Sequence, residues 1–214
     1  MKKQIISFLF SVFLLTFSSY TIAHPHAFIS MTNKVLVEKG NLMGFSVQWV
    51  LDEVSSAGVL YDLKQIKDPK ERQAFVDSMM KNITSEHYFS YFFDKQGNKI
   101  KYLSKPKNYG MKSNGTEALY YFDFLLSQPQ KLENNIFELS TYDESYYVSM
   151  YYDKEQIKKV VDFSQLPKNC KGRVVEPNVD QKIKEYASSL DKNQVNVDTS
   201  LGKIFAQRVV IKCE

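Results

Sequence analysis

Several residue types that mark particular functions are scarce in this chain. Its 214 residues include two cysteines, three histidines and one tryptophan. The sequence contains no G-x-S-x-G, no H-E-x-x-H and no glycine-rich phosphate loop, which are common signatures of hydrolases, zinc proteases and nucleotide-binding enzymes. We therefore expect a protein that is not an enzyme.

Charge of one sign and long hydrophobic runs are also scarce. The formal net charge is +4, and the lysines are scattered, so we expect no nucleic-acid surface. The longest apolar run, residues 5–17, is too short to span a membrane as a helix. Lys2 and Lys3 precede this run, and Thr21 and Ala23 follow it with the spacing of a signal-peptidase site.

This N-terminal pattern predicts a cleavable signal peptide over residues 1–23 and a single exported domain over residues 24–214. An N-terminal anchor that is never cleaved is the alternative, and the small-residue cleavage site speaks against it. The mature chain of about 190 residues is long enough for one domain with a sizeable core. We do not expect it to be embedded in the membrane after cleavage.

The two cysteines, Cys170 and Cys213, predict a disulfide, because an exported chain folds in an oxidising compartment. The bond would close a loop of roughly 44 residues and contribute about 4 kcal/mol on the chain-entropy model. It would tie the C-terminal segment to the body of the domain. Two thiolate metal ligands are the alternative.

Strands dominate the periodicity of the mature chain. Residues 28–37 and 42–51 predict a hairpin, in which Phe45, Val47 and Trp49 share one face. Helices are predicted at residues 68–83, where Asp68 is a good N-cap and Pro69 suits the first position, and at 180–190. The fold class is therefore α+β, a mostly antiparallel sheet or sandwich with about two added helices and one disulfide. Further strands are expected within residues 87–103, 117–129, 134–143, 144–153 and 203–213.

His24 and His26 flank a proline directly after the predicted cleavage site. After cleavage His24 would carry a free α-amine, with a reference pKa of about 7.7–8.0, beside an imidazole with one of about 6.5. A metal can displace the remaining proton near neutral pH. The extended backbone before Pro25 places the two imidazoles on the same side. Because Pro25 lacks an N–H, the remaining nitrogen cluster suits zinc, copper, nickel or cobalt.

A metal site also needs ligands from the body of the domain. Carboxylates at a strand end are usually solvated or cap the next element, and a lone histidine is more typical of a strand edge. The N-terminal histidines themselves can be an accident in a disordered tail. Candidates by residue type are Asp52, Glu53, Asp143, Glu144 and His87.

These motifs together resemble one family. "HPHAFI", "WVLDEVSSA" and "YDESYYV" are similar to the His-Pro-His, W-x-x-D-E-x-x-S-A and Y-D-x-x-Y-Y-V motifs of the domain-of-unknown-function 1007 family, often labelled the periplasmic component of an ABC-type transport system. "HYFSYF", "KPKNYG", "LPKNC" and "FAQRVVIKC" are similar too, so the resemblance covers nearly the whole mature chain.

The resemblance implies a Gram-negative periplasmic protein that works with a membrane permease of the nickel/cobalt type. Some such pairs are linked to zinc acquisition. Carried over to this sequence, the resemblance points to His24, His26, Glu53 and Asp143 as the metal ligands, with Asp52 and Tyr146 next.

We therefore expect a periplasmic metal-binding accessory protein of a membrane metal-transport system. Zinc is the first choice, because mixed nitrogen and oxygen ligands suit it, and copper, nickel or cobalt are alternatives. A non-metal-binding adaptor that docks on or stabilises the permease through exposed aromatic side chains is the main rival. A copper redox enzyme is a third hypothesis, for which only His87 could supply another nitrogen.

Overall fold

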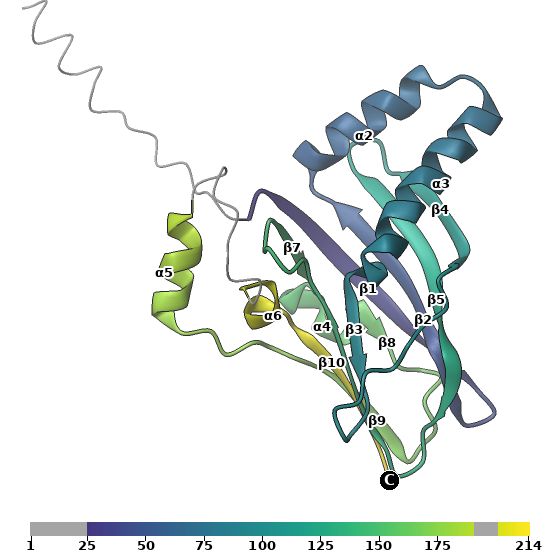
Figure 1. Cartoon of the computed structure of the whole chain (residues 1–214), viewed down its shortest axis with the longest axis vertical. Coiled ribbons are helices and arrows are strands. Elements are labelled where there is room, and N and C mark those ends of the chain that lie inside the picture. Colours follow the sequence, from purple (N-terminus) through teal and green to yellow (C-terminus); the bar gives the residue numbers. More distant parts are fainter. Residues whose placement is uncertain (1–24, 191–200) are drawn as a thin grey trace, which may run out of the picture.

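The computed structural model describes residues 25–190 and 201–214, so the predicted signal peptide, its cleavage site and His24 lie outside the described part. Two sheets with added helices confirm the α+β class (Figure 1). The larger sheet has the order β4-β5-β2-β1-β7, with β8 also on β1, and the smaller has the order β3-β6-β10-β9. β7 and β8 run parallel to β1, so the larger sheet is mixed.

The strands are β1 (Ala27–Glu38), β2 (Asn41–Leu51), β3 (Ser90–Phe93), β4 (Lys107–Ser113), β5 (Ala118–Lys131), β6 (Ile136–Thr141), β7 (Val148–Tyr151), β8 (Val161–Asp162), β9 (Cys170–Val175) and β10 (Arg208–Cys213). The helices are α2 (Glu53–Gln65), α3 (Pro69–Ser85), α4 (Ile157–Val160), α5 (Gln181–Ser189) and α6 (Leu201–Phe205), with short 3-10 turns η1 (His87–Phe89) and η2 (Lys154–Gln156).

The predicted first hairpin forms the centre of the larger sheet. β1 and β2 pair antiparallel, and Lys39 and Gly40 make the turn with φ values of 49° and 76°. Phe45, Val47 and Trp49 are all buried on the inner face of β2, as their period of two predicts. This hairpin places the N-terminal end of β1 beside the C-terminal end of β2.

Aromatic rings join the inner face of the larger sheet to the smaller sheet. Phe45 of β2 meets Phe92 of β3 edge-on, with ring centroids 5.4 Å apart, and Phe92 stacks on Phe137 of β6. Tyr88 of η1 stacks on Phe124 of β5 at 5.3 Å. Such pairs contribute about 0.5–1.5 kcal/mol each beyond the burial of their area. The core therefore lies between the sheets.

A buried polar group also links the sheets. The phenol of Tyr152, which is 1 % exposed, accepts a hydrogen bond from Asn33 Nδ2 of β1 at 2.7 Å. Gln207 accepts from the Tyr152 N–H at 2.6 Å and donates to its C=O at 3.0 Å. Among the described residues, the buried Asn33 Oδ1 has no hydrogen-bond partner.

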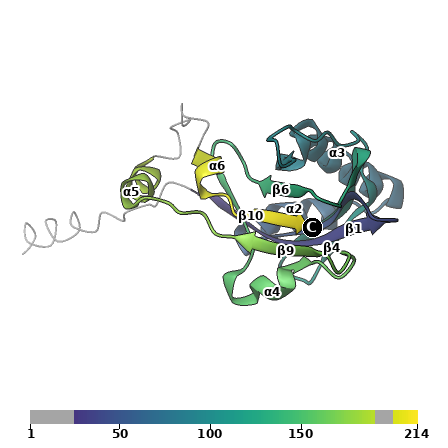
Figure 2. The same cartoon turned by 90° about the horizontal axis from the view of Figure 1, so that it is seen from below.

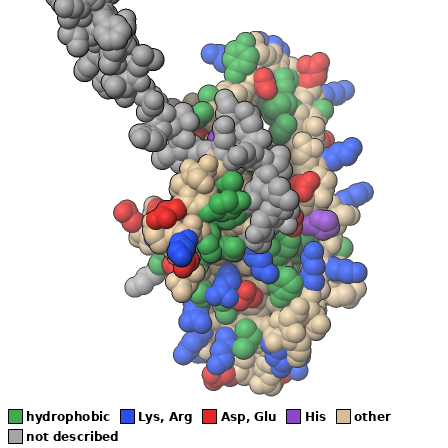
Figure 3. All heavy atoms as spheres, turned by 60° about the vertical axis from the view of Figure 1, so that its left-hand side comes forward, with side chains coloured by type: hydrophobic (Ala, Val, Ile, Leu, Met, Phe, Trp, Pro, Cys, Tyr) green, Lys and Arg blue, Asp and Glu red, His purple; other side chains and the backbone are tan. Residues whose placement is uncertain are grey.

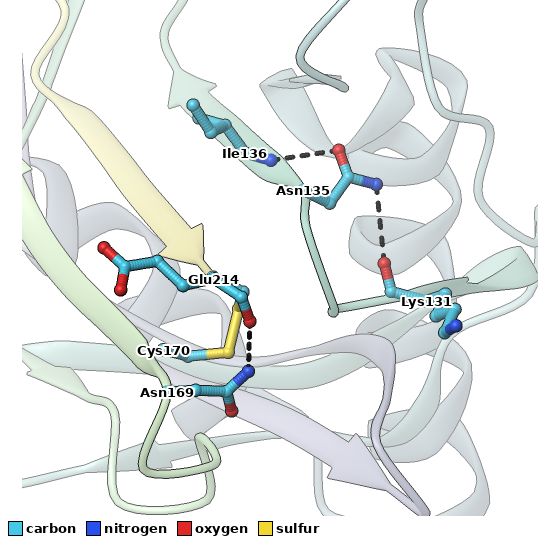
Figure 4. Close-up of a disulfide and its surroundings, with 7 residues drawn as sticks. Lys131, Asn135, Ile136, Asn169, Cys170 and Glu214 are labelled. Atoms are coloured by element: carbon cyan, nitrogen blue, oxygen red, sulfur yellow. Dashed lines mark hydrogen bonds between the residues drawn. A yellow bond between two sulfur atoms is a disulfide. The ribbon is translucent and has the colours of Figure 1, made fainter.

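The predicted disulfide closes the smaller sheet. Cys213 of β10 faces Cys170 of β9 in register, and the two are bonded (Figure 4). The Cys213 N–H donates to the Asn135 C=O at 2.9 Å, and the Asn169 amide donates to the Glu214 C=O. The end of β10 is thus held on both sides.

The helical hairpin α2–α3 contains one predicted and one unpredicted helix. α3 begins as expected, with the Asp68 side chain accepting from the Lys70 N–H at 2.6 Å, and its Met80 is buried in the core. α2 was not predicted, because it has no strong apolar stripe and contains valine, serine and glycine, which are poorer helix formers than alanine or leucine. Asp52 starts it as the N-cap.

α5, also predicted, stands apart from the sheets (Figure 2). Its Ala187 and Leu190 form a small separate cluster with Leu201 of α6, against which Tyr146 and Phe205 pack. No helix in residues 25–190 or 201–214 is long and apolar enough to cross a membrane. The disulfide fits an oxidising compartment outside the cytoplasm.

Candidate functional site

Three motifs singled out in the sequence meet at one end of the larger sheet. β1 lies between β2 and β7, so the start of β1 adjoins the end of β2 and the start of β7. The Asp52 N–H donates to the Phe28 C=O at 2.9 Å on one side, and the His26 N–H donates to the Tyr147 C=O at 2.9 Å on the other. His26 of the first motif, the Asp-Glu motif and the Tyr-Asp motif therefore share the upper end of the sheet in Figure 1.

The Asp52 side chain joins β1 to α2 at this end of the sheet. Its carboxylate accepts from the Phe28 N–H at 2.7 Å and from the Ser55 N–H and hydroxyl, both at 2.8 Å. Burial alone would raise the pKa of Asp52, but these hydrogen bonds outweigh burial and lower the pKa below its usual value. Asp52 thus acts as a helix cap and as a clamp on β1.

Asp143 performs the same task on the β7 side. Its carboxylate accepts from the Ser145 hydroxyl at 2.8 Å, from the Val148 N–H at 3.0 Å and from the Ser145 N–H at 3.2 Å. Tyr146 in this loop has a φ of 59°, and Gly202 lies so close that a Cβ there would meet the Asp143 C=O. The loop is held in one shape by its own carboxylate and by α6.

His26 lies against this loop. Its imidazole contacts the Tyr147 ring, with centroids 4.7 Å apart and planes tilted by 45°. Its main chain bonds to the same residue, so both backbone and ring are positioned by Tyr147. Tyr147 itself is 48 % exposed, which leaves this corner of the molecule open to partners.

The predicted metal ligands are only partly brought together. His24 lies outside the described residues, and Glu53 is exposed on the first turn of α2. Within residues 25–190 and 201–214, no three histidine, cysteine, aspartate or glutamate side chains form a group able to hold a metal ion. The ligand set of His24, His26, Glu53 and Asp143 stays a prediction.

A tyrosine that the sequence reasoning overlooked connects this corner to the smaller sheet. Tyr91 of β3 donates to Glu144 Oε1 at 2.8 Å and stacks on Tyr142 at 4.3 Å. Burial, together with the hydrogen bond to Glu144, raises the pKa of Tyr91. The stretch "HYFSYF" was noted, but nothing in its spacing indicates which tyrosine meets the loop. Glu144 is thereby tied to a phenol, while His87 is exposed.

A groove of about 550 Å³, here called the β7 groove, runs beside β7. Its opposite wall comes from residues 176–179, from α5 and from α6. Figure 3 shows this side of the molecule, where hydrophobic side chains gather in the middle and acidic and basic ones are interspersed. Its lining includes Phe28, Val148, Met150, Val179 and Phe205.

A second, mainly apolar cavity of about 350 Å³ lies between the larger sheet and α3. Trp49, Met79, Ile83 and Phe89 line it, and Glu86 also belongs to its lining. Met79 and Ile83, which lie four residues apart on one face of α3, therefore face the sheet.

Comparison with known proteins places this chain in a family. Residues 9–213 match the profile described as "Protein of unknown function (DUF1007)". A Haemophilus influenzae protein described as uncharacterized is 53% identical over 206 residues, which cover 96% of this chain and 98% of the relative. The chain belongs to the DUF1007 family.

Proposed function

We propose that this member of the DUF1007 family is a periplasmic metal-binding accessory protein of a membrane metal-transport system, with zinc as its cargo. The observation that carries the proposal is the meeting of three motifs at the start of β1, where Tyr147 bonds to His26 and Asp52 bonds to Phe28, two residues further along. Copper, nickel and cobalt are the other cargoes that the nitrogen-rich N-terminus suits. The transport partner would be a permease of the nickel/cobalt type.

The roles of the residues differ in this proposal. His24, through its α-amine and imidazole, and His26 supply nitrogen, and Glu53 supplies a carboxylate that is exposed at the same end of the sheet. Asp143 already accepts three hydrogen bonds, so its main part is to position the loop beside His26. Carboxylates that orient a ligand in this way tune metal affinity without direct contact.

Zinc titration of the exported, mature protein tests the proposal. We expect His26→Ala to weaken zinc affinity at least tenfold, because a ligand is lost, and His87→Ala to leave it unchanged, because His87 is an exposed histidine outside the site. An extra residue before His24 would weaken binding if the α-amine is a ligand. Zinc affinity that is identical in the wild-type and His26→Ala proteins would contradict the proposal.

A non-metal adaptor is the second candidate, and exposed aromatic side chains at the same end favour it. Phe28, Tyr147 and Tyr151 are 45 %, 48 % and 39 % exposed. This function predicts that the His24→Ala/His26→Ala double variant still associates with the permease and supports transport. Co-purification of the variant with the permease separates the two candidates.

A further inference from the structure

β7 has one edge that no strand covers within the described residues, since it ends the strand order of the larger sheet. Main-chain groups of successive residues point to opposite edges of a strand. The N–H and C=O of Tyr152 bond to Gln207, and the N–H of Val148 bonds to Asp143. The main-chain groups of the even-numbered residues of this segment therefore point away from β1. Met150 therefore presents its N–H and its C=O to the open edge.

We propose that this edge binds an extended peptide segment of a partner protein, which adds a strand beside β7 in the β7 groove. Asp143 and Gln207 close the two ends of the open stretch, which spans from Val148 to Tyr152 over about 13 Å. Between them a partner residue meets the Val148 C=O and the Met150 N–H. The N–H and C=O of one residue in an extended chain point to the same edge, so such a residue offers a donor and an acceptor at this spacing.

The shape of the groove supports a single strand as its occupant. A volume of about 550 Å³ lies within the usual range for ligand sites. Val179 and Phe205 lie on the wall opposite β7, and Phe28 adds an exposed ring. Main-chain pairing would thus give affinity, and apolar side chains of the partner would fill the space against this wall.

Two other occupants fit less well. A charged ligand finds little net charge, because Lys154 and Glu176 in the lining pair with each other at 3.0 Å. A second copy of this chain, pairing through its own β7, would bring a whole sheet to a groove whose far side is already occupied by α6 and residues 176–179. An isolated extended segment avoids this obstruction.

Amide hydrogen exchange on the mature, disulfide-bonded protein tests the open edge without any ligand. The N–H groups of Ser149 and Tyr151 face β1 and are expected to be protected, because the parallel ladder uses them. The Met150 N–H is expected to exchange at least ten times faster than either neighbour. Equal protection of the three amides would overturn the proposal.

Linear decapeptides enriched from a random displayed library serve as the probe for binding. We expect an enriched peptide to slow exchange at Met150 at least tenfold and to lose binding when its central amides are N-methylated. Val179→Glu, in the groove wall, should weaken peptide binding at least tenfold. Val54→Glu, the same change at a residue that is 86 % exposed on α2, should not.

A library without binders would overturn the proposal, as would peptides that leave Met150 exchange unchanged. Equal peptide affinity in Val179→Glu and wild type, with both proteins folded by thermal melting, would overturn it as well. No metal enters these experiments, so their result is independent of the zinc titration.

Discussion

The hydrogen bond between Asn33 of β1 and Tyr152, the residue after β7, gives a sharp prediction about what stabilises the core beside β7. Tyr152→Phe removes the phenolic oxygen and leaves the Asn33 Nδ2 buried without an acceptor. A buried donor stripped of its partner costs about 1–3 kcal/mol. For a domain of this size each kcal/mol lowers Tm by about 2–4 °C. We therefore expect Tyr152→Phe to be clearly destabilising.

A double-mutant cycle also needs a variant that removes the other partner, Asn33. Asn33→Val replaces a side chain whose Oδ1 already lacks a partner among the described residues, and valine suits a strand. This single change is expected to stay within about 1 kcal/mol of neutral, because it removes one hydrogen bond and one unpaired buried oxygen together. In the Asn33→Val background, Tyr152→Phe should then cost at least about 1 kcal/mol less than in the wild type.

Urea unfolding of the four proteins, with the disulfide intact, measures the coupling directly. Purely additive effects would show that the Asn33–Tyr152 bond contributes nothing specific, and the reasoning about buried donors would be refuted. Equal slopes of the unfolding free energy against urea in all four proteins are the control that the unfolded states are comparable.

Two further predictions concern covalent and ionic contributions. The Cys170→Ala/Cys213→Ala double variant should lose about 4 kcal/mol in urea unfolding, because the unfolded chain regains the freedom of the loop, and an unchanged midpoint would contradict this. The lowered pKa of Asp52 contributes stability that is present above its unfolded pKa of about 3.9 and is lost as pH falls through the folded value. In Asp52→Asn the asparagine still caps α2, so the Tm of this variant should fall less than that of the wild type on acidification below about pH 5. Parallel curves of Tm against pH for the two proteins would refute this prediction.

Local signals in the sequence predict much of this fold. The period of two in β2, the capping pattern at Asp68 and the pairing of Cys170 with Cys213 act over short distances or through known chemistry, and all are confirmed. The strand β9 was not predicted, because its segment contains Gly172 and alternates charged with small residues. That glycine is needed where the Phe163 ring lies, which only the folded structure reveals.

The assignment of strands to sheets is beyond local signals. Residues 117–129 and 134–143 predicted two strands joined by a turn, and β5 and β6 are both present. The two strands nevertheless belong to different sheets, because β5 pairs with β2 and β6 pairs with β10. Pairings between segments so far apart in sequence depend on the whole core.

The candidate site also combines features that the sequence predicts with features that only the folded structure reveals. The sequence motifs indicated that residues near His26, Asp52 and Asp143 belong together, and the order β2-β1-β7 brings their backbones side by side. The bond of Asp52 to the Phe28 N–H was not predictable, since long-range pairing places β1 beside it, whereas the Asp52 cap on Ser55 and the Asp143 bonds to Ser145 and Val148 are local.

The parallel pairing of β1 with β7 means that the two sides of β1 gain their partners at different stages of chain synthesis. Phe28 bonds to Asp52 at the end of the hairpin on one side of β1, but on the other side Ala27 pairs with Val148, so this side is completed only after about 120 further residues, and contacts of such long range form slowly. The predicted cleavage site at Ala23 lies just ahead of the first of these hydrogen bonds, at His26. A precursor that folded before removal of the predicted signal peptide would therefore offer the peptidase a bond next to an already paired strand.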